Sequence, residues 1–343
     1  MLTKTEISDD QVAALLAPLG AVRRVAPLSG GLFASVVRAD LADGRTVVVK
    51  VTGADTTRLL RYEHGVLGTE ATVDRIAHAA GLPVPRVLHV DTTRAHVDGD
   101  ALVTTFLAGD PWSTLELDDA AAARARRSLG SLMARLHRLT RDDLTRQDGA
   151  PDDGRRFGYP APEAGLAAPT WPEAFAGMVR AALDDAARWG VDLPAARLLA
   201  AVDDHRDLLA DVTTPRLVHA DLWPGNLLLD PADRTVVGAL DGERALWGDP
   251  VFELVGADQL GAGAVDPDLL AGYRDAGGDL GIGDGTPGSG DPDAWQRLRL
   301  YRAYFACLLV VEIVPRAYAG DWVAGHERTA RANLLQMLDE LGA

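Results

Sequence analysis

The chain has 343 residues, of which 47% are hydrophobic, so it is long enough to form two unequal lobes around a sizeable core. Its formal net charge of −16 argues against a nucleic-acid-binding protein, because phosphate backbones bind a basic surface. No apolar run reaches membrane-spanning length, the start MLTKTEISDD is unlike a secretory signal, and the single cysteine, Cys307, excludes an internal disulfide. We therefore expect a cytoplasmic protein without a membrane or nucleic-acid partner.

The first 106 residues predict a small antiparallel sheet of five strands with one inserted helix. A short amphipathic helix is expected over about 9–18, after the N-cap Ser8. A helical pattern then covers 56–80, where Gly65 and Gly68 are expected to break or bend it and Gly81 to end it. The strand-like runs are 22–29, 33–41, 46–52, 82–90 and 100–107.

The remaining residues, 107–343, predict a larger and mainly helical lobe. Three short strands, RLVHA, NLLLD and TVVGALD, interrupt the helices. The Gly/Asp-rich segment 277–293 predicts a mobile surface loop. Together the two parts predict an α+β fold with an N-terminal lobe at 1–106 and a C-terminal lobe at 107–343. The expected helices are 117–140, 172–189, 194–211, 251–260, 266–276, 294–317 and 321–342.

The acidic charge is concentrated in the larger part. Residues 1–110 carry 11 basic and 13 acidic side chains, a balance of −2, whereas the rest carries 23 and 37, a balance of −14. Such a field could attract a cationic small molecule. The alternative is that the acidic surface only keeps the protein soluble.

Polar side chains gather where the short strands of the larger part end. His219 and Asp221 follow one apolar run, Asn226 comes five residues later, and Asp241 follows TVVGAL. Carboxylate and amide oxygens are the ligands that Mg²⁺ prefers, usually together with phosphate oxygens. Asp221 could accept a hydrogen bond from an attacking hydroxyl and orient it. The alternative is ordinary turn capping by Asp221 and Asn226, and a zinc site would lack further cysteine or histidine ligands.

These motifs resemble the aminoglycoside phosphotransferase family, which has the protein-kinase-like fold. VHADLWPGN is similar to the family's H-G-D-x-x-x-x-N, and LDGERALWGDP to its I-D-[WF]-E…G-D-P. SGGLFASVVRA resembles the nucleotide loop, VVVK the third-strand lysine, and TEATVDRIAHAAGLPVPRVL the helix and strand that follow. The matches span roughly 28–255 in the family's order.

The resemblance implies a role for each matching residue. Lys50 would contact the α/β phosphates and pair with Glu70, with Glu63 as the competing partner. Alone, Lys50 could instead be a charge that protects a strand edge. Asp221 would be the catalytic base, and Asn226 and Asp241 would bind Mg²⁺. The backbone of Ser29, Gly30, Gly31 and Leu32 would cover the phosphates. The main chain of Thr105, Phe106 and Leu107 would form hydrogen bonds with adenine.

Several residues depart from the family pattern or have no role in it. Ala220 replaces a glycine, which we expect to be harmless, and Gly242 replaces an aromatic residue, which we expect to loosen the packing. His219 and Asp249 would support the catalytic loop. Trp171, Trp247 and Trp322 are expected in the core rather than in a substrate pocket. Glu253 and Glu312 could contact a cationic substrate, although pairing with an internal arginine is the favoured interpretation for Glu312.

The resemblance implies transfer of a phosphoryl group from ATP or GTP, with Mg²⁺, to a hydroxyl of a small molecule. We expect the acceptor to be an aminoglycoside-type or other antibiotic. The alternatives are a metabolite such as a fructosamine, an amino alcohol or a sugar, and a pseudokinase that binds nucleotide without catalysis. Trp223 stands where Ser/Thr protein kinases have lysine, and the A-P-E segment of protein kinases is missing, so a protein substrate is not expected.

Overall fold

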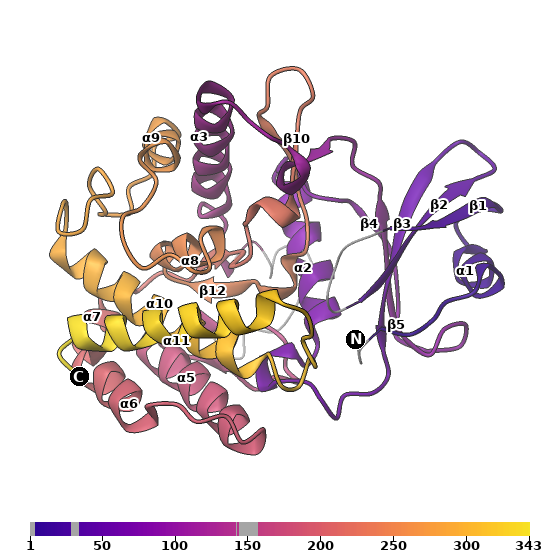
Figure 1. Ribbon diagram of the computed structural model, residues 1–343. Coiled ribbons are helices and arrows are strands. Elements are labelled where there is room, and N and C mark those ends of the chain that lie inside the picture. The colour runs from indigo at the N-terminus through magenta and orange to yellow at the C-terminus, as the bar shows by residue number, and fades with distance from the viewer. Residues whose placement is uncertain (1–3, 29–33, 142, 144–156) are drawn as a thin grey trace.

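The computed structural model describes residues 4–28, 34–141, 143 and 157–343 (Figure 1). In Figure 1 a twisted sheet lies at one end and most helices lie at the other. The sheet has the order β1-β2-β3-β5-β4, and all four of its pairings are antiparallel. Its strands are β1 (Val22–Pro27), β2 (Ser35–Leu41), β3 (Thr46–Gly53), β4 (Val87–Asp91) and β5 (Gly99–Thr105).

The alternation of side chains along β3 decides what each face of the sheet does. Val47, Val49 and Val51 point to one face, where they are buried against helix α1 (Asp9–Leu16). Lys50 therefore points to the opposite face, and its register partner on β5 is Leu102. Leu102 packs there against helix α2 (Val66–Ala79). The strand thus presents its one charged side chain to α2.

Helix α2 is bounded by two glycines in left-handed backbone conformations. Gly65 is the N-cap with φ +76°, and it separates α2 from a short 3₁₀ turn, η1 (Arg61–Glu63). At the other end Gly81 has φ +74° and donates to His78 O, while the Leu82 N–H donates to Ala77 O. These two bonds form a Schellman motif. The predicted helix 56–80 is therefore shorter, and Gly68 lies inside it without breaking it.

The helices of the larger part agree with the expected ones except at a few boundaries. The pattern at 194–211 gives two helices, because the chain turns at His205. The pattern at 251–260 gives a 3₁₀ turn, η5 (Pro250–Phe252), followed by one short helix. The helices are α3 (Asp119–Leu136), α5 (Trp171–Arg188), α6 (Ala195–Asp204), α7 (Arg206–Ala210), α8 (Glu253–Ala257), α9 (Pro267–Asp275), α10 (Pro292–Val311) and α11 (Trp322–Glu340).

Among the described residues of the larger part, two small antiparallel sheets precede and follow its loops. One has the order β11-β10-β6 and the other β8-β7-β12-β9. The three expected strands are present as β9 (Arg216–Val218), β10 (Leu227–Leu229) and β11 (Val236–Ala239). The other four are two or three residues long, too short for an alternating pattern to reveal them: β6 (Asp110–Pro111), β7 (Phe157–Gly158), β8 (Ala167–Ala168) and β12 (Leu246–Gly248).

One hydrophobic core extends from the helices of the larger part into α2. Val73, Ile76 and Ala77 of α2 belong to the same buried cluster as residues of α3, α5 and α10. Only Leu67 and Ala71 of α2 pack with the face of the sheet. Helix α2 therefore packs on both parts, and the boundary at residue 106 stays a prediction.

The Gly/Asp-rich segment 277–293 lies mostly at the surface, as expected from its composition, and is anchored on the core, while its expected mobility stays a prediction. Leu280 and Ile282 are buried in the core. The Trp295 indole donates to Ser289 O at 2.6 Å, and the Val265 N–H donates to Gly285 O at 2.8 Å. Two buried apolar side chains and these bonds anchor the segment. Among the described residues, no helix combines the length and the apolar character that a membrane span requires.

Candidate active site

The loop after β9 is held in an unusual conformation by a buried carboxylate. Ala220 has φ +61°, in the left-handed region that strains residues other than glycine. Both oxygens of Glu253 accept backbone bonds there, from the His219 N–H at 2.8 Å and from the Ala220 N–H at 2.9 Å. Gly256 of α8 packs directly on the Ala220 carbonyl. The replacement of glycine by Ala220 thus introduces strain, and the contacts of α8 hold the loop against it.

Glu253 is ionised in the folded protein because its partners offset its burial. Burial would raise its pKa, but the hydrogen bond and charge of His137, together with the bonds from the loop, lower the pKa below its usual value. Its side chain is fully buried. The suggestion that Glu253 contacts a cationic substrate is therefore wrong; it holds the backbone of the loop.

This loop presents Asp221 with both carboxylate oxygens in hydrogen bonds. Oδ2 accepts from the Asn226 amide nitrogen at 2.7 Å, and Oδ1 accepts from the Gln259 amide nitrogen at 2.6 Å. The Arg244 Nε lies 3.9 Å from Oδ1. Burial raises the pKa of Asp221 from 3.8 to about 7, and the charge of Arg244 opposes the rise. Asp221 is thus a buried carboxyl whose pKa lies near neutrality, as general bases often require.

The hairpin of β10 and β11 brings Asn226 and Asp241 to the same end. Asn226 directly precedes β10, Asp241 follows β11, and the Leu240 N–H donates to Asn226 O at 2.9 Å. Asp241 has φ +69°, a conformation that aspartate tolerates better than most residues. Asn226 also donates to Asp221 O, so its amide nitrogen is committed and its amide oxygen remains for a cation. An amide oxygen and a carboxylate are suitable ligands for Mg²⁺, so Asn226 and Asp241 both stay candidate ligands.

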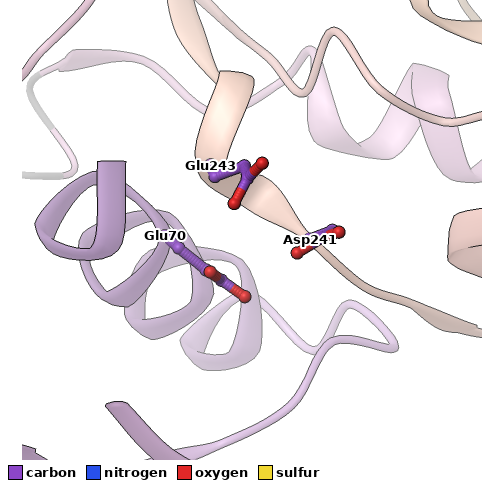
Figure 2. A group of neighbouring side chains, drawn as sticks. All are labelled: Glu70, Asp241 and Glu243. Carbon is purple, nitrogen blue, oxygen red and sulfur yellow. The ribbon is translucent and has the colours of Figure 1, made fainter. Parts of the chain in front are cut away.

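Lys50 lies among three carboxylates from different parts of the chain. Its Nζ is 2.6 Å from Glu70 Oε2 and 3.1 Å from Glu243 Oε2, and it also forms an ion pair with Asp241. Figure 2 shows Glu70 on α2 facing Asp241 and Glu243, which lie on the segment after β11. Burial would lower the pKa of Lys50, but the three negative charges raise it well above its usual value. Lys50 is therefore a buried cation.

The carboxylates differ in what their surroundings do to them. Burial raises the pKa of Glu70 to about 7, and the charge of Lys50 opposes the rise. Burial likewise raises the pKa of Glu243. For Asp241 burial acts in the same direction, but the charge of Lys50 outweighs it and the pKa is lowered. Among these carboxylates, Asp241 is therefore the one whose ionised form the Lys50 ammonium stabilises most.

Glu63, the alternative partner of Lys50, faces a different residue. It forms an ion pair with Arg316, and its other oxygen accepts from the Leu60 N–H at 2.7 Å. Gly65 lies between Glu63 and α2, so the two glutamates do not share the one helix that the helical pattern over 56–80 had predicted.

Glu312 has internal partners, as favoured from the sequence. It accepts hydrogen bonds from Arg244 at 2.9 Å and from the Tyr62 hydroxyl at 2.7 Å. Arg316 Nη1 lies 3.3 Å from its second oxygen. This buried network connects the turn before α2 with the end of α10. Its Arg244 is the residue that lies 3.9 Å from Asp221 Oδ1.

The expected nucleotide contacts on the N-terminal part are only partly described. Ser29, Gly30, Gly31 and Leu32 lie outside the described residues. Thr105 ends β5, and its hydroxyl accepts from the Arg86 N–H at 2.9 Å. The Phe106 ring is 38% exposed and has the Arg38 guanidinium 5.0 Å from its centroid.

The predicted supports of the loop differ in their contacts. Asp249 Oδ2 accepts from Arg297 Nε and from the Tyr301 hydroxyl, each at 2.8 Å. Its other oxygen accepts from the Val251 N–H and starts η5. His219 is buried, and burial lowers its pKa, so its ring is neutral. Asp249 thus fixes the chain that leads to α8.

The tryptophans divide between core and surface. Trp171 and Trp247 are buried in the large core, as expected. Trp322 is 48% exposed, so its predicted place in the core is wrong. It lies at the first turn of α11, where its ring packs beside Tyr318 with centroids 5.3 Å apart.

Three residues at this site were not assigned from the sequence: Glu243, Arg244 and Gln259. Glu243 and Arg244 come two and three residues after Asp241, so their closeness to it in sequence was the available signal. Gly242 gives no looser packing: a Cβ there would lie 3.3 Å from Val73 Cγ1, so α2 occupies the space beside it. Gln259 is 38 residues from Asp221, and no sequence pattern joins them.

Comparisons with known proteins agree with this geometry. A model of the phosphotransferase enzyme family matches residues 24–301. A putative aminoglycoside phosphotransferase from Ralstonia eutropha JMP134 superposes with a TM-score of 0.64 at 12% identity, covering 98% of this chain and 99% of that one. A putative fructosamine-3-kinase from Thermobifida fusca YX-ER1 gives 0.52 at 20% identity, covering 97% and 100%. A spectinomycin phosphotransferase in complex with ADP and spectinomycin gives 0.56 at 12%, covering 98% and 99%.

At identities below 25% these structures show a shared fold, and they confirm the predicted α+β, protein-kinase-like class. The family model spans more than half of the sequence and includes both the Lys50 strand and the Asp221 loop. The chain therefore belongs to the phosphotransferase enzyme family.

Proposed function

We propose that the protein transfers the γ-phosphoryl group of ATP or GTP to a hydroxyl of a small molecule. The observation that carries this proposal is that a buried carboxyl and a buried ammonium group lie in one site. Asp221 is a buried carboxyl with a pKa of about 7, and Lys50 is a buried ammonium among carboxylates that include Asp241. A phosphoryl transfer needs a group that orients the attacking hydroxyl and cations that hold the phosphates.

The residues of the chain would act mainly by positioning and electrostatics. Asp221 would accept the hydrogen bond of the acceptor hydroxyl and then its proton. Lys50, fixed by Glu70, would bind phosphate oxygens. The main chain of Thr105, Phe106 and Leu107 would form hydrogen bonds with the purine base of the nucleotide. Asn226 and Asp241 would hold Mg²⁺, which when bound neutralises phosphate charge. The family match and the ADP complex of the similar spectinomycin phosphotransferase support nucleotide binding.

For the acceptor we propose an antibiotic of the aminoglycoside type or another cationic antibiotic. The balance of −14 over residues 111–343 supports a cationic acceptor, because an acidic lobe attracts cations. The similar structures include a putative aminoglycoside phosphotransferase and a spectinomycin phosphotransferase in complex with spectinomycin. The putative fructosamine-3-kinase supports the alternative of a metabolite kinase.

The test is a screen of acceptors with ATP and with GTP, using wild-type protein and Asp221→Ala. We expect one acceptor class to give transfer, and the variant to lose about 10²–10⁴ in turnover while nucleotide binding is retained. Nucleotide binding without turnover on any acceptor would instead support the pseudokinase alternative. A change in the minimum inhibitory concentration of a sensitive host separates an antibiotic acceptor from a metabolite.

A further inference from the structure

Gln259 occupies one oxygen of the proposed catalytic base. Its amide nitrogen donates to Asp221 Oδ1 at 2.6 Å, while Asn226 holds Oδ2. The Asp221 side chain is only 10% exposed. The hydroxyl of a phosphoryl acceptor can therefore bind Oδ1 only by displacing the Gln259 amide from it.

The backbone around Gln259 is fixed independently of this bond. Asn333 donates to Leu260 O at 2.7 Å, and Arg302 donates to Gly263 O at 2.8 Å. Both donors come from the long helices α10 and α11, so the turn after α8 is anchored on the core. The bond to Asp221 can therefore break by rotation of the Gln259 side chain alone, on the fast timescale of partly exposed rotamers.

The exchange of an amide for a hydroxyl conserves the hydrogen bonding of the buried carboxylate. A buried carboxylate oxygen that loses its hydrogen-bond donor is destabilised, because burial also keeps it from water. In the free protein the Gln259 N–H supplies that partner, and in a complex the acceptor O–H would supply it. Each is a single neutral donor to the same oxygen.

From this geometry we propose that Gln259 is an acceptor-site residue that covers Asp221 until the acceptor hydroxyl displaces it. This inference rests on the proposed function. It gives Gln259 two effects: it competes with the acceptor for Oδ1, and it keeps water from the same position. Without it, water can take the place of the acceptor. The water oxygen then bonds to Pγ, the bond from Pγ to the β,γ-bridging oxygen breaks, and Asp221 receives the water proton.

The experiment measures hydrolysis of ATP with Mg²⁺ and no acceptor in wild type, Gln259→Ala and Gln259→Met. Methionine keeps the length of the side chain and removes the donor, which guards against a folding defect in the alanine variant. We expect both variants to hydrolyse ATP about 2- to 10-fold faster, the factor for one net hydrogen bond, with the KM for ATP unchanged. Gln336→Ala is the matched control, since Gln336 donates to Ala262 O and Glu340 without touching Asp221.

A residue that only positions Asp221 would give the opposite result, slower hydrolysis in both variants, and that result overturns the proposal, as does an unchanged rate. Asp221→Ala distinguishes this failure from a failure of the proposed function. If wild-type hydrolysis depends on Asp221 and the Gln259 variants match wild type, only the role of Gln259 is wrong. If hydrolysis in wild type and Asp221→Ala is the same, the role of Asp221 itself is wrong.

Discussion

The Lys50 ammonium and the Glu70 carboxylate, 2.6 Å apart, join the sheet to helix α2. Lys50 comes from β3 and Glu70 from α2, and Asp241 and Glu243 complete the surroundings of the ammonium. One ligand oxygen from each of the three carboxylates lies within 4.8 Å of the others. Three carboxylates this close repel one another unless a cation lies among them.

Lys50→Met should therefore turn this place into a divalent-cation site. Without the ammonium, oxygens of Glu70, Asp241 and Glu243 could hold a divalent cation, because hard cations such as Mg²⁺ bind carboxylate oxygens. We expect the variant to be less stable than wild type without metal and to gain more in Tm on addition of Mg²⁺, as measured by thermal denaturation. Arg45→Met is the control, because it removes an exposed ion pair with Asp43. Equal Mg²⁺ responses in wild type and Lys50→Met would show that the three carboxylates do not act together.

The free energy of unfolding of Asp221→Asn, compared with that of wild type, should be higher at pH 8 than at pH 4. Asp221 has a folded pKa of about 7 against 3.8, so the folded state binds more protons than the unfolded state between about pH 4 and 7. The free energy of unfolding of wild type thus falls as the pH rises through this window, and asparagine removes that loss. At 1.36 kcal/mol per pKa unit the gain is bounded at roughly 4 kcal/mol.

Chemical denaturation of both proteins across pH 4 to 8 measures this difference. A constant difference over the range would mean that the Asp221 carboxyl titrates alike in the folded and unfolded protein. The loss of turnover in the same variant would show that the charge which weakens the fold is the one the reaction uses.

Gly256→Ala should lower both stability and turnover, because it disturbs the backbone that presents Asp221. A Cβ at Gly256 would lie 2.3 Å from Ala220 C and 2.7 Å from Asp221 N, and neither backbone atom can move without the loop. We expect a loss of about 1–3 kcal/mol in the free energy of unfolding, as for overpacked cores. Gly177→Ala in α5 is the control, since nothing lies within 4 Å of its Cβ.

Urea denaturation and turnover of the two glycine variants give the comparison. Gly177→Ala should gain about 0.5–1 kcal/mol, the usual benefit of alanine in a helix. Wild-type turnover in Gly256→Ala would indicate that the loop can shift without consequence for Asp221.

Local patterns were sufficient for most of the fold. The β-branched residues of TVVVKVT predicted β3, and the valines that the strand buries on one face explain why Lys50 faces α2. Capping and glycine positions predicted where α1 begins and where α2 ends. The short strand β12 was missed, because its pairing with β9 depends on partners distant in sequence and not on a pattern of its own.

The candidate site was predictable only where its residues belong to a contiguous motif. Asp221 and Asn226 lie five residues apart, and the β10–β11 hairpin brings Asp241 beside them. The bonds of Glu253 and Gln259 to this loop form because α8 packs on it, and packing between distant segments leaves no periodic signal. Glu312 was recognisable because a charge within an apolar run requires a partner, although the sequence could not name Arg244 or Tyr62 as those partners.

The membership of α2 in the large core has a consequence for dissecting the chain. A fragment of residues 1–106 would carry the sheet intact but would expose Val73, Ile76 and Ala77, which are buried against the helical part in the whole protein. An apolar stripe of this kind promotes self-association. The N-terminal part is thus completed by its neighbour, and separating the two by truncation would yield an aggregating peptide rather than an autonomous module.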